Sequence, residues 1–259
     1  MSILVIGNDQ RQLRLCRILC ENGYRAYHYS GDRELIEECS TVILPLPLSR
    51  DGVTVNSVAD MNLEELSDHL DGKRVFYGMG TPEFTARMRS TAKLMLDYNT
   101  LEYFQYENAR ITALGALAMA IEELDISLID CRAMIIGFGR IGKFLAKNLL
   151  SLGASVAVCA RRDSDLAFAN SLGYRTYDIS SGFPSSLAEV PNIIFNTAPA
   201  KIFKRENSQM LKRIPMLDLA GNGSAVDFCG RVIPAMSLPS KFSPESAALV
   251  LYNSIKDKL

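Results

Sequence analysis

Short apolar segments alternate with longer amphipathic segments along almost the whole chain. Residues 2–6 form the first apolar segment, and in residues 10–21 apolar side chains recur at helical spacing until Asn22-Gly23 ends the pattern. The same alternation predicts further strands at 24–29, 41–44, 74–77 and 93–96, and a short helix at 35–39. Strands that alternate with helices are typical of a parallel sheet covered on both faces.

A long Ala-, Leu- and Met-rich segment, residues 111–124, predicts a helix that connects two such series. In the second series, strands are expected at 133–136, 155–159, 174–177, 192–196, 216–219 and 231–233. Residues 247–256 have the pattern of a closing amphipathic helix. We therefore expect a first domain in residues 1–108, a second in 109–245, and a C-terminal helix in 246–259 that packs back on the first domain.

Composition narrows the functional classes. Of 259 residues, 48% are hydrophobic and 22% charged, and the formal net charge is −1. That balance is ordinary for a globular protein and argues against a nucleic-acid binder. No apolar run reaches the ~18 residues of a membrane span, and residues 1–7 show no signal-peptide pattern. We expect a cytoplasmic protein that binds neither nucleic acid nor membrane.

The cysteines lack the paired CxxC spacing of zinc sites. We expect the six cysteines to be buried free thiols in a reducing compartment and to bind no metal. They are Cys16, Cys20, Cys39, Cys131, Cys159 and Cys229.

A glycine-rich turn follows the predicted strand 133–136 and opens a predicted helix at 141–151; it consists of Gly137, Phe138, Gly139, Arg140, Ile141 and Gly142. In a dinucleotide-binding fingerprint, the first glycine permits the tight turn, the second lets the backbone approach a pyrophosphate, and the third lets helix and strand pack closely. A ligand-free glycine turn is the alternative. The pattern predicts an α/β fold of two Rossmann-like doubly wound parallel-sheet domains joined by a long helix, with the dinucleotide in the second domain.

The end of the next strand indicates which dinucleotide is bound. NAD sites usually carry an acidic residue there for the ribose 2′-hydroxyl, but this chain has Ala160-Arg161-Arg162, and Asp163 lies past the usual position. Two guanidinium groups can bind a 2′-phosphate in bidentate fashion. NADP is therefore favoured as cofactor, with a solvated arginine pair as the alternative.

Two later loops complete the predicted cofactor site. Asn196, Thr197 and Pro199 follow one strand, and Asp218 ends another, before a loop that continues through Gly221-Asn222-Gly223. Loops at the carboxyl edge of a parallel sheet are where such folds bind ligands, so we expect these residues near the nicotinamide ribose. Purely structural turns remain an equal alternative.

The first domain has polar loops after its first and third strands. Asp9 and Arg11 follow the first strand, and Ser49 and Arg50 follow the third, after Pro45 and Pro47. Arginine forks suit carboxylates, so Arg11, with Arg50 second, is the expected anchor of a small dicarboxylate in an interdomain cleft. Ordinary surface charges are the alternative.

These motifs together resemble the A subunit of dipicolinate synthase over nearly the whole chain. The matching segments are 7–11, 44–52, Asn108 with Thr112-Ala113 and Gly115-Ala116, the 137–142 fingerprint, Ala160-Arg161, Asn196-Thr197 with Pro199, 217–220, Asp227-Phe228, and Leu238-Pro239 with Pro244. The resemblance implies two Rossmann-like domains and NADP-dependent oxidation of a dihydro- or hydroxytetrahydrodipicolinate to dipicolinate for endospores. The resemblance further implies that the partner is a flavoprotein-like B subunit of the synthase, and it is compatible with a homo-oligomer. It also adds Asn108 and Thr112 to the expected substrate site.

The chain departs from that family's pattern at the connecting helix. Ile111 and Leu114 stand where the family usually has a proline and a glutamate. A lost carboxylate there bears on substrate orientation or proton movement, so a diverged member with altered activity is expected. Another NADP-dependent oxidoreductase of a small carboxylate, and a nucleotide-binding regulatory subunit that has lost turnover, are the alternatives.

No catalytic base is assigned from the sequence. The histidines are His28, in an apolar and aromatic strand where a structural role is expected, and His69, in a polar segment where it is expected to be solvated. Because forming an aromatic ring provides driving force, catalysis by orientation of nicotinamide and substrate is sufficient for the expected reaction.

Overall fold

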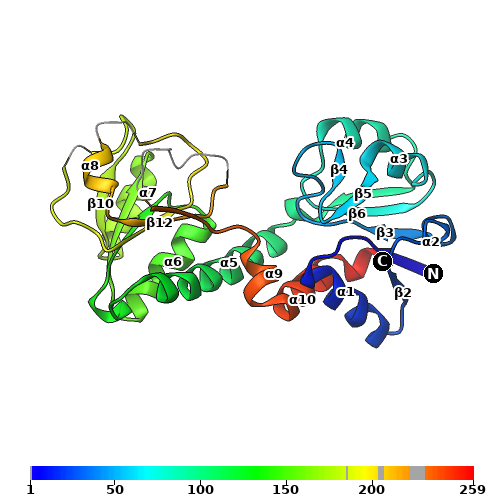
Figure 1. Cartoon of the computed structure of the whole chain (residues 1–259), viewed down its shortest axis with the longest axis horizontal. Coiled ribbons are helices and arrows are strands. Elements are labelled where there is room, and N and C mark those ends of the chain that lie inside the picture. Colours follow the sequence, from blue (N-terminus) through cyan, green and yellow to red (C-terminus); the bar gives the residue numbers. More distant parts are fainter. Residues whose placement is uncertain (1, 185, 204–206, 222–230) are drawn as a thin grey trace. The chain divides into compact units, whose positions relative to one another are not determined.

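The computed structural model describes residues 2–184, 186–203, 207–221 and 231–259 of the chain. It divides into two compact units, here called unit 1 (residues 1–108 and 239–259) and unit 2 (residues 109–238). Both units are built from parallel strands and helices (Figure 1), so the predicted α/β class with two doubly wound sheets is confirmed. None of the helices in the described part is long and apolar enough to cross a membrane.

Unit 1 contains a five-stranded parallel sheet in the order β2-β1-β3-β6-β7. Its strands are β1 (Ser2–Val5), β2 (Arg25–His28), β3 (Thr41–Ile43), β6 (Arg74–Tyr77) and β7 (Leu94–Asp97). This is one of the two common doubly wound orders, and its topological switch point lies between β1 and β3. The loops that follow these two strands therefore begin side by side at the carboxyl edge.

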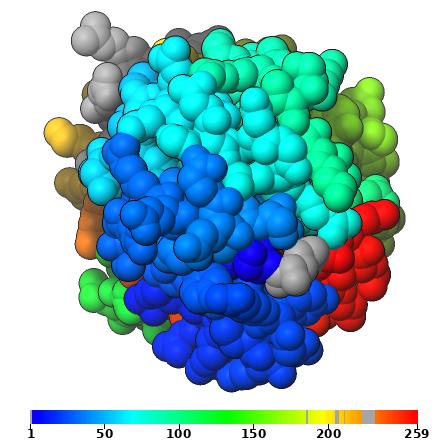
Figure 2. Space-filling model, turned by 90° about the vertical axis from the view of Figure 1, so that its right-hand side faces the viewer, coloured from blue at the N-terminus to red at the C-terminus, as the bar shows by residue number. Residues whose placement is uncertain are grey.

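The helices of unit 1 are α1 (Gln10–Glu21), α2 (Glu34–Glu38), α3 (Leu63–Asp68), α4 (Pro82–Met88), α9 (Leu238–Phe242) and α10 (Pro244–Ile255), with short 3-10 turns at Tyr98–Thr100 and Lys256–Lys258. The C-terminal helix α10 packs along α1, and Figure 2, which faces unit 1, shows red C-terminal residues beside blue N-terminal ones. An ion pair between Arg17 and Glu245, 2.5 Å long, joins the two helices. The last helix thus completes the unit that the first residues begin.

Unit 2 contains a six-stranded parallel sheet in the order β10-β9-β8-β11-β12-β13. Its strands are β8 (Arg132–Ile136), β9 (Ser155–Ala160), β10 (Arg175–Asp178), β11 (Ile193–Asn196), β12 (Pro215–Asp218) and β13 (Arg231–Pro234). The helices are α6 (Arg140–Ser151), α7 (Asp163–Ser171) and α8 (Ser208–Leu211), and a 3-10 turn covers Leu128–Asp130. Numbered along the unit, this order is 3-2-1-4-5-6, the order of classic dinucleotide-binding domains, and its switch point lies between β8 and β11.

The structure corrects several predicted bounds. The connecting helix α5 spans Glu102–Glu123 and so begins nine residues before the predicted 111. Its first turns contain Tyr103, Phe104 and Tyr106, and the weaker helix propensity of aromatic residues explains the missed start. Tertiary packing holds these turns: Phe104 is fully buried and meets Tyr98 edge-on, with ring centroids 5.1 Å apart. A hairpin of β4 (Thr54–Val55) and β5 (Val58–Asn62) was not predicted.

Candidate functional site

The fingerprint forms the turn between β8 and α6. Gly137 has a φ of +92°, and a Cβ there would lie 2.7 Å from Oγ1 of Thr197. A Cβ on Gly142 would collide with the carbonyl oxygen of Gly137. The chain itself therefore requires glycine at both positions, the first for the left-handed turn and the second for close packing of α6 on the turn.

Gly139 differs from the other two glycines. It is the N-cap of α6, its backbone is extended (φ −76°, ψ −164°), and no atom lies within 4 Å of the place where a Cβ would stand. Any residue adopts this conformation, so the fold does not demand glycine here. The missing side chain leaves open space at a helix N-terminus, where free N–H groups and the helix dipole favour an anion. The geometry fits the close approach of a pyrophosphate.

A cavity of about 530 Å³ opens in front of this turn. Of the residues predicted to bind cofactor, it is lined by Gly137, Phe138, Gly139, Ala160, Arg161, Arg162, Thr197 and Pro199. They come from the ends of β8, β9 and β11, which are neighbours at the switch point. The structure thus brings most of the predicted cofactor residues together in one cavity within unit 2.

The other predicted cofactor residues lie around this cavity. Arg140 and Ile141 begin α6, and Gly142 packs against the turn. Asn196 and Asp218 are buried at the ends of β11 and β12, where the Asn196 amide donates to Oδ1 of Asp218 over 2.9 Å. The same oxygen accepts from the N–H of Ala220 at 3.2 Å. Asn196 and Asp218 therefore shape the loops instead of lining the cavity. The loop residues Asn222 and Gly223 and the motif Asp227-Phe228 lie outside the described residues.

The arginine pair follows β9 as predicted. Ala160 is buried as the last residue of that strand, so no carboxylate stands at the usual position for an NAD ribose. Both arginines are exposed, and Arg162 pairs with Asp165, with 2.7 Å between Nη2 and Oδ2. Asp165 also lines the cavity. Asp165 was not predicted from the sequence, although its three-residue spacing from Arg162 at the start of a helix is typical of such a pair.

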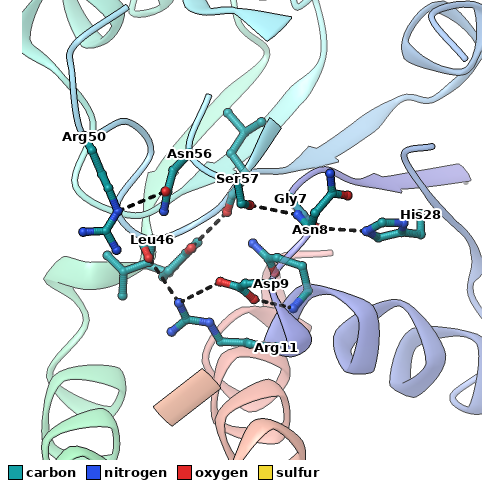
Figure 3. Close-up of polar contacts among 12 residues, drawn as sticks. Gly7, Asn8, Asp9, Arg11, His28, Leu46, Arg50, Asn56 and Ser57 are labelled. Atoms are coloured by element: carbon teal, nitrogen blue, oxygen red, sulfur yellow. Dashed lines mark hydrogen bonds and ion pairs between the residues drawn. The ribbon is translucent and has the colours of Figure 1, made fainter. Parts of the chain in front are cut away.

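In unit 1, the loops after β1 and β3 meet in a polar cluster (Figure 3). Asp9 caps α1 by accepting from the N–H of Gln12 at 3.0 Å. Arg11 is 4% exposed; its Nη2 donates to the carbonyl of Leu46 at 3.2 Å and lies 3.6 Å from Oδ2 of Asp9. Arg11 therefore ties the N-terminus of α1 to the proline-containing loop, in contrast to the open loop arginine expected from sequence.

Ser49 and Arg50 lie further along the same loop after β3. Arg50 is exposed, and its Nε donates to Oδ1 of Asn56 at 3.2 Å. Ser49 donates to Asp51, whose carboxylate also accepts from Val53 and Thr54. Those hydrogen bonds stabilise the charged form and hold the pKa of Asp51 far below its usual range. The loop that presents Arg50 is thus organised by one carboxylate.

The two remaining predicted substrate residues lie on α5. Asn108 is half-buried and Thr112, one turn later, is buried. Ile111 is buried beside them, whereas Leu114 is 46% exposed. The position where the resemblance expects a glutamate therefore presents an apolar side chain to solvent.

Within the described part of the chain, no histidine or cysteine is among the residues that line the cavity of unit 2. His28 Nε2 lies 2.8 Å from the carbonyl oxygen of Gly7, a contact that fits the structural role expected for this residue. His69 ends α3 and pairs with Glu37 instead of being merely solvated. Among the cysteines of the described part, three are buried free thiols as predicted, but Cys16 is half-buried and Cys20 is exposed; the buried ones are Cys39, Cys131 and Cys159. No group of three or more metal-binding side chains occurs among the described residues.

Two doubly wound parallel sheets, one with the glycine-rich turn at its switch point, define a fold of the dehydrogenase type. No family model matches the chain. Transhydrogenase from Sinorhizobium meliloti superposes with a TM-score of 0.66 at 14% identity, over 100% of this chain and 92% of that one.

The full-length similarity is more specific. The chain is 24% identical to the A subunit of dipicolinate synthase from Bacillus subtilis (strain 168), over all of this chain and 96% of that protein. The crystal structure of the dipicolinate synthase A subunit from Bacillus halodurans superposes with a TM-score of 0.82 at 20% identity, covering 99% of this chain and 97% of that one. The predicted resemblance to the A subunit of dipicolinate synthase, with this chain as a diverged relative, is confirmed.

Proposed function

We propose that the chain is an NADP-dependent oxidoreductase that converts a dihydro- or hydroxytetrahydrodipicolinate to dipicolinate in endospore formation, as the A subunit of a dipicolinate synthase. The observation that carries the proposal is the cavity in which Gly139 and the arginines 161 and 162 meet, in a chain similar over its whole length to such a protein. We expect it to act in the cytoplasm, where its partner is a flavoprotein-like B subunit.

The residues of unit 2 have defined proposed roles. The N–H groups at the start of α6 hold the pyrophosphate where Gly139 leaves space. Arg161 and Arg162 hold the 2′-phosphate, and Thr197 and Pro199 border the nicotinamide ribose. The hydrogen bond between Asn196 and Asp218 stabilises the loop that forms this border. A bound nicotinamide supplies the hydride acceptor, and the protein contributes position and charge.

The residues proposed to bind substrate are Asp9, Arg11, Ser49 and Arg50 of unit 1, with Asn108 and Thr112 on α5. Loops after β1 and β3 stand at the switch point, where such sheets bind ligands. Arg50 is the exposed guanidinium proposed to contact a carboxylate, while buried Arg11 holds the loop after β3 in place. Both histidines are engaged elsewhere, so the proposal assigns neither as a base.

A second candidate function is favoured by Leu114. An exposed leucine cannot orient a substrate or move a proton as a glutamate can, so a nucleotide-binding regulatory protein without turnover is the alternative.

Turnover separates these functions. The purified chain, with and without the B subunit, is mixed with NADP and a freshly generated hydroxytetrahydrodipicolinate, and NADPH and dipicolinate are followed together. Equal formation of both products is expected. NADP binding without turnover, also after Leu114→Glu, supports the regulatory protein. Turnover only with other small carboxylates identifies a different oxidoreductase.

A further inference from the structure

The two arginines at the end of β9 are not equivalent. Nε and Nη2 of Arg162 lie 2.8 and 2.7 Å from the same carboxylate oxygen, Oδ2 of Asp165. Within the described part of the chain, no ion pair of this kind joins Arg161 to an acidic residue. Arg162 therefore already has an anionic partner, whereas Arg161, which also lines the cavity, has none among the described residues.

The carboxylate of this pair is much less exposed to solvent than the guanidinium. The Arg162 side chain is 74% exposed, but that of Asp165 is only 14% exposed and lines the cavity. Asp165 lies in the first turn of α7, where the helix dipole favours an anion. Strand β9 ends in Ala160, which has no acidic group, so Asp165 is the acidic residue among the described residues that line the cavity. A largely exposed cation thus rests on a largely buried anion.

We propose that Asp165 is a specificity-determining residue, which competes with the 2′-phosphate for Arg162 and so limits the preference for NADP over NAD. This inference rests on the proposed dinucleotide site. The Nε–Nη2 edge of Arg162 already binds Asp165. A phosphate dianion that takes this edge must therefore displace the carboxylate, and one that binds the remaining N–H groups is repelled by the carboxylate's charge. A ribose 2′-hydroxyl needs no such exchange, so NAD binding leaves the pair intact.

The test measures binding by calorimetry, using NADP and NAD with the full chain. The isosteric variant Asp165→Asn keeps the size of the side chain and removes its charge. The matched control is Asp163→Asn, which removes the same charge from an exposed residue in the same helical turn that does not line the cavity. Arg162→Ala and the double variant Arg162→Ala/Asp165→Asn complete a cycle that isolates the pair. Thermal melting of each variant reports on folding.

We expect Asp165→Asn to raise the ratio of NADP to NAD affinity about two- to fivefold, the range of one ion pair at a largely exposed site, and Asp163→Asn to leave it unchanged. In the Arg162→Ala background the gain should vanish. An unchanged or lowered ratio in a folded Asp165→Asn variant overturns the inference, and so does a gain that persists without Arg162. If the parent chain binds neither dinucleotide, the proposed cofactor site itself fails as well.

Discussion

The side-chain amide of Asn196 donates to the buried carboxylate of Asp218 at 2.9 Å, and this contact joins the ends of neighbouring strands β11 and β12. The Asp218 carboxylate is largely screened from solvent, so its hydrogen bonds replace the lost hydration. The pair therefore holds two loops of the proposed cofactor site in register.

We predict that Asn196→Ala lowers the free energy of unfolding by about 1.5–3 kcal/mol, the usual cost of a lost hydrogen bond to a charged group. Urea unfolding measures this loss. Asn170→Ala, an exposed asparagine in α7, serves as control and should change stability by less than about 0.5 kcal/mol. Equal stability of the two variants would mean that the Asn196–Asp218 contact contributes nothing to the fold.

Gly139 and Gly142 should respond differently to the same substitution. Gly139→Val meets open space, so the variant should melt like the parent but lose dinucleotide binding. Gly142→Val collides with the Gly137 carbonyl, so it should lower the melting temperature. Melting curves and NADP titration of both variants check this. Unchanged NADP affinity in Gly139→Val would show that the turn binds no pyrophosphate.

Arg161 should contribute directly to cofactor choice. We expect the parent to bind NADP more tightly than NAD, and Arg161→Ala to lose about 1.5–3 kcal/mol of NADP affinity, because one charge-assisted contact disappears. Arg213→Ala, an exposed arginine that does not line the cavity, is the control. Calorimetric titration decides the matter, and an equal or greater affinity for NAD in the parent would contradict NADP as the cofactor.

Substitutions of Arg50 and Arg11 should have different effects, the first on substrate binding and the second on the stability of unit 1. Arg50→Ala should leave the melting temperature unchanged and weaken dipicolinate binding by about 2 kcal/mol or more, as expected for a lost arginine–carboxylate contact. Arg11→Ala should mainly lower stability, by about 1–3 kcal/mol, since the Leu46 carbonyl and Asp9 lose a buried partner. NADP affinity should stay constant in both. Parent-like dipicolinate binding by both variants would remove the dicarboxylate site from unit 1.

Alkaline pH should destabilise the chain through Cys159. Burial raises the pKa of this thiol from its ordinary 9.0 to about 12, because the thiolate is poorly solvated in the core. The unfolded chain therefore loses the proton first, so the thiol's contribution is complete below pH 9 and is lost as pH rises toward 12. At pH ~10 the loss is about 1.4 kcal/mol.

The measurement is the free energy of unfolding at about pH 7 and about pH 10, on either side of the unfolded thiol's pKa. Cys159→Ala should show a shallower decline of the free energy of unfolding than the parent, because the variant lacks the buried thiol. Identical slopes for the parent and Cys159→Ala would contradict the effect.

The parts of the fold that could be predicted from the sequence depend on local patterns along the chain. The fingerprint could be predicted because the constraints that require Gly137 and Gly142 lie within a short stretch of chain. Helix α1 was predicted at its observed bounds because its apolar spacing and its end at Asn22-Gly23 are local features. The start of α5 was not legible, since Phe104 is held there by Tyr98, packing that helix propensity does not encode.

By itself the sequence determined the strand–helix alternation, the dinucleotide turn and the absence of an acidic residue at Ala160. These depend on residue type and spacing, and the chain cannot change them by folding. Only the tertiary structure decided that Arg11 is buried against the Leu46 carbonyl, 35 residues away, and that Asn196 pairs with Asp218 across 22 residues. The physical reason is that burial and pairing are set by the strand order, which brings distant loops to one edge of a sheet.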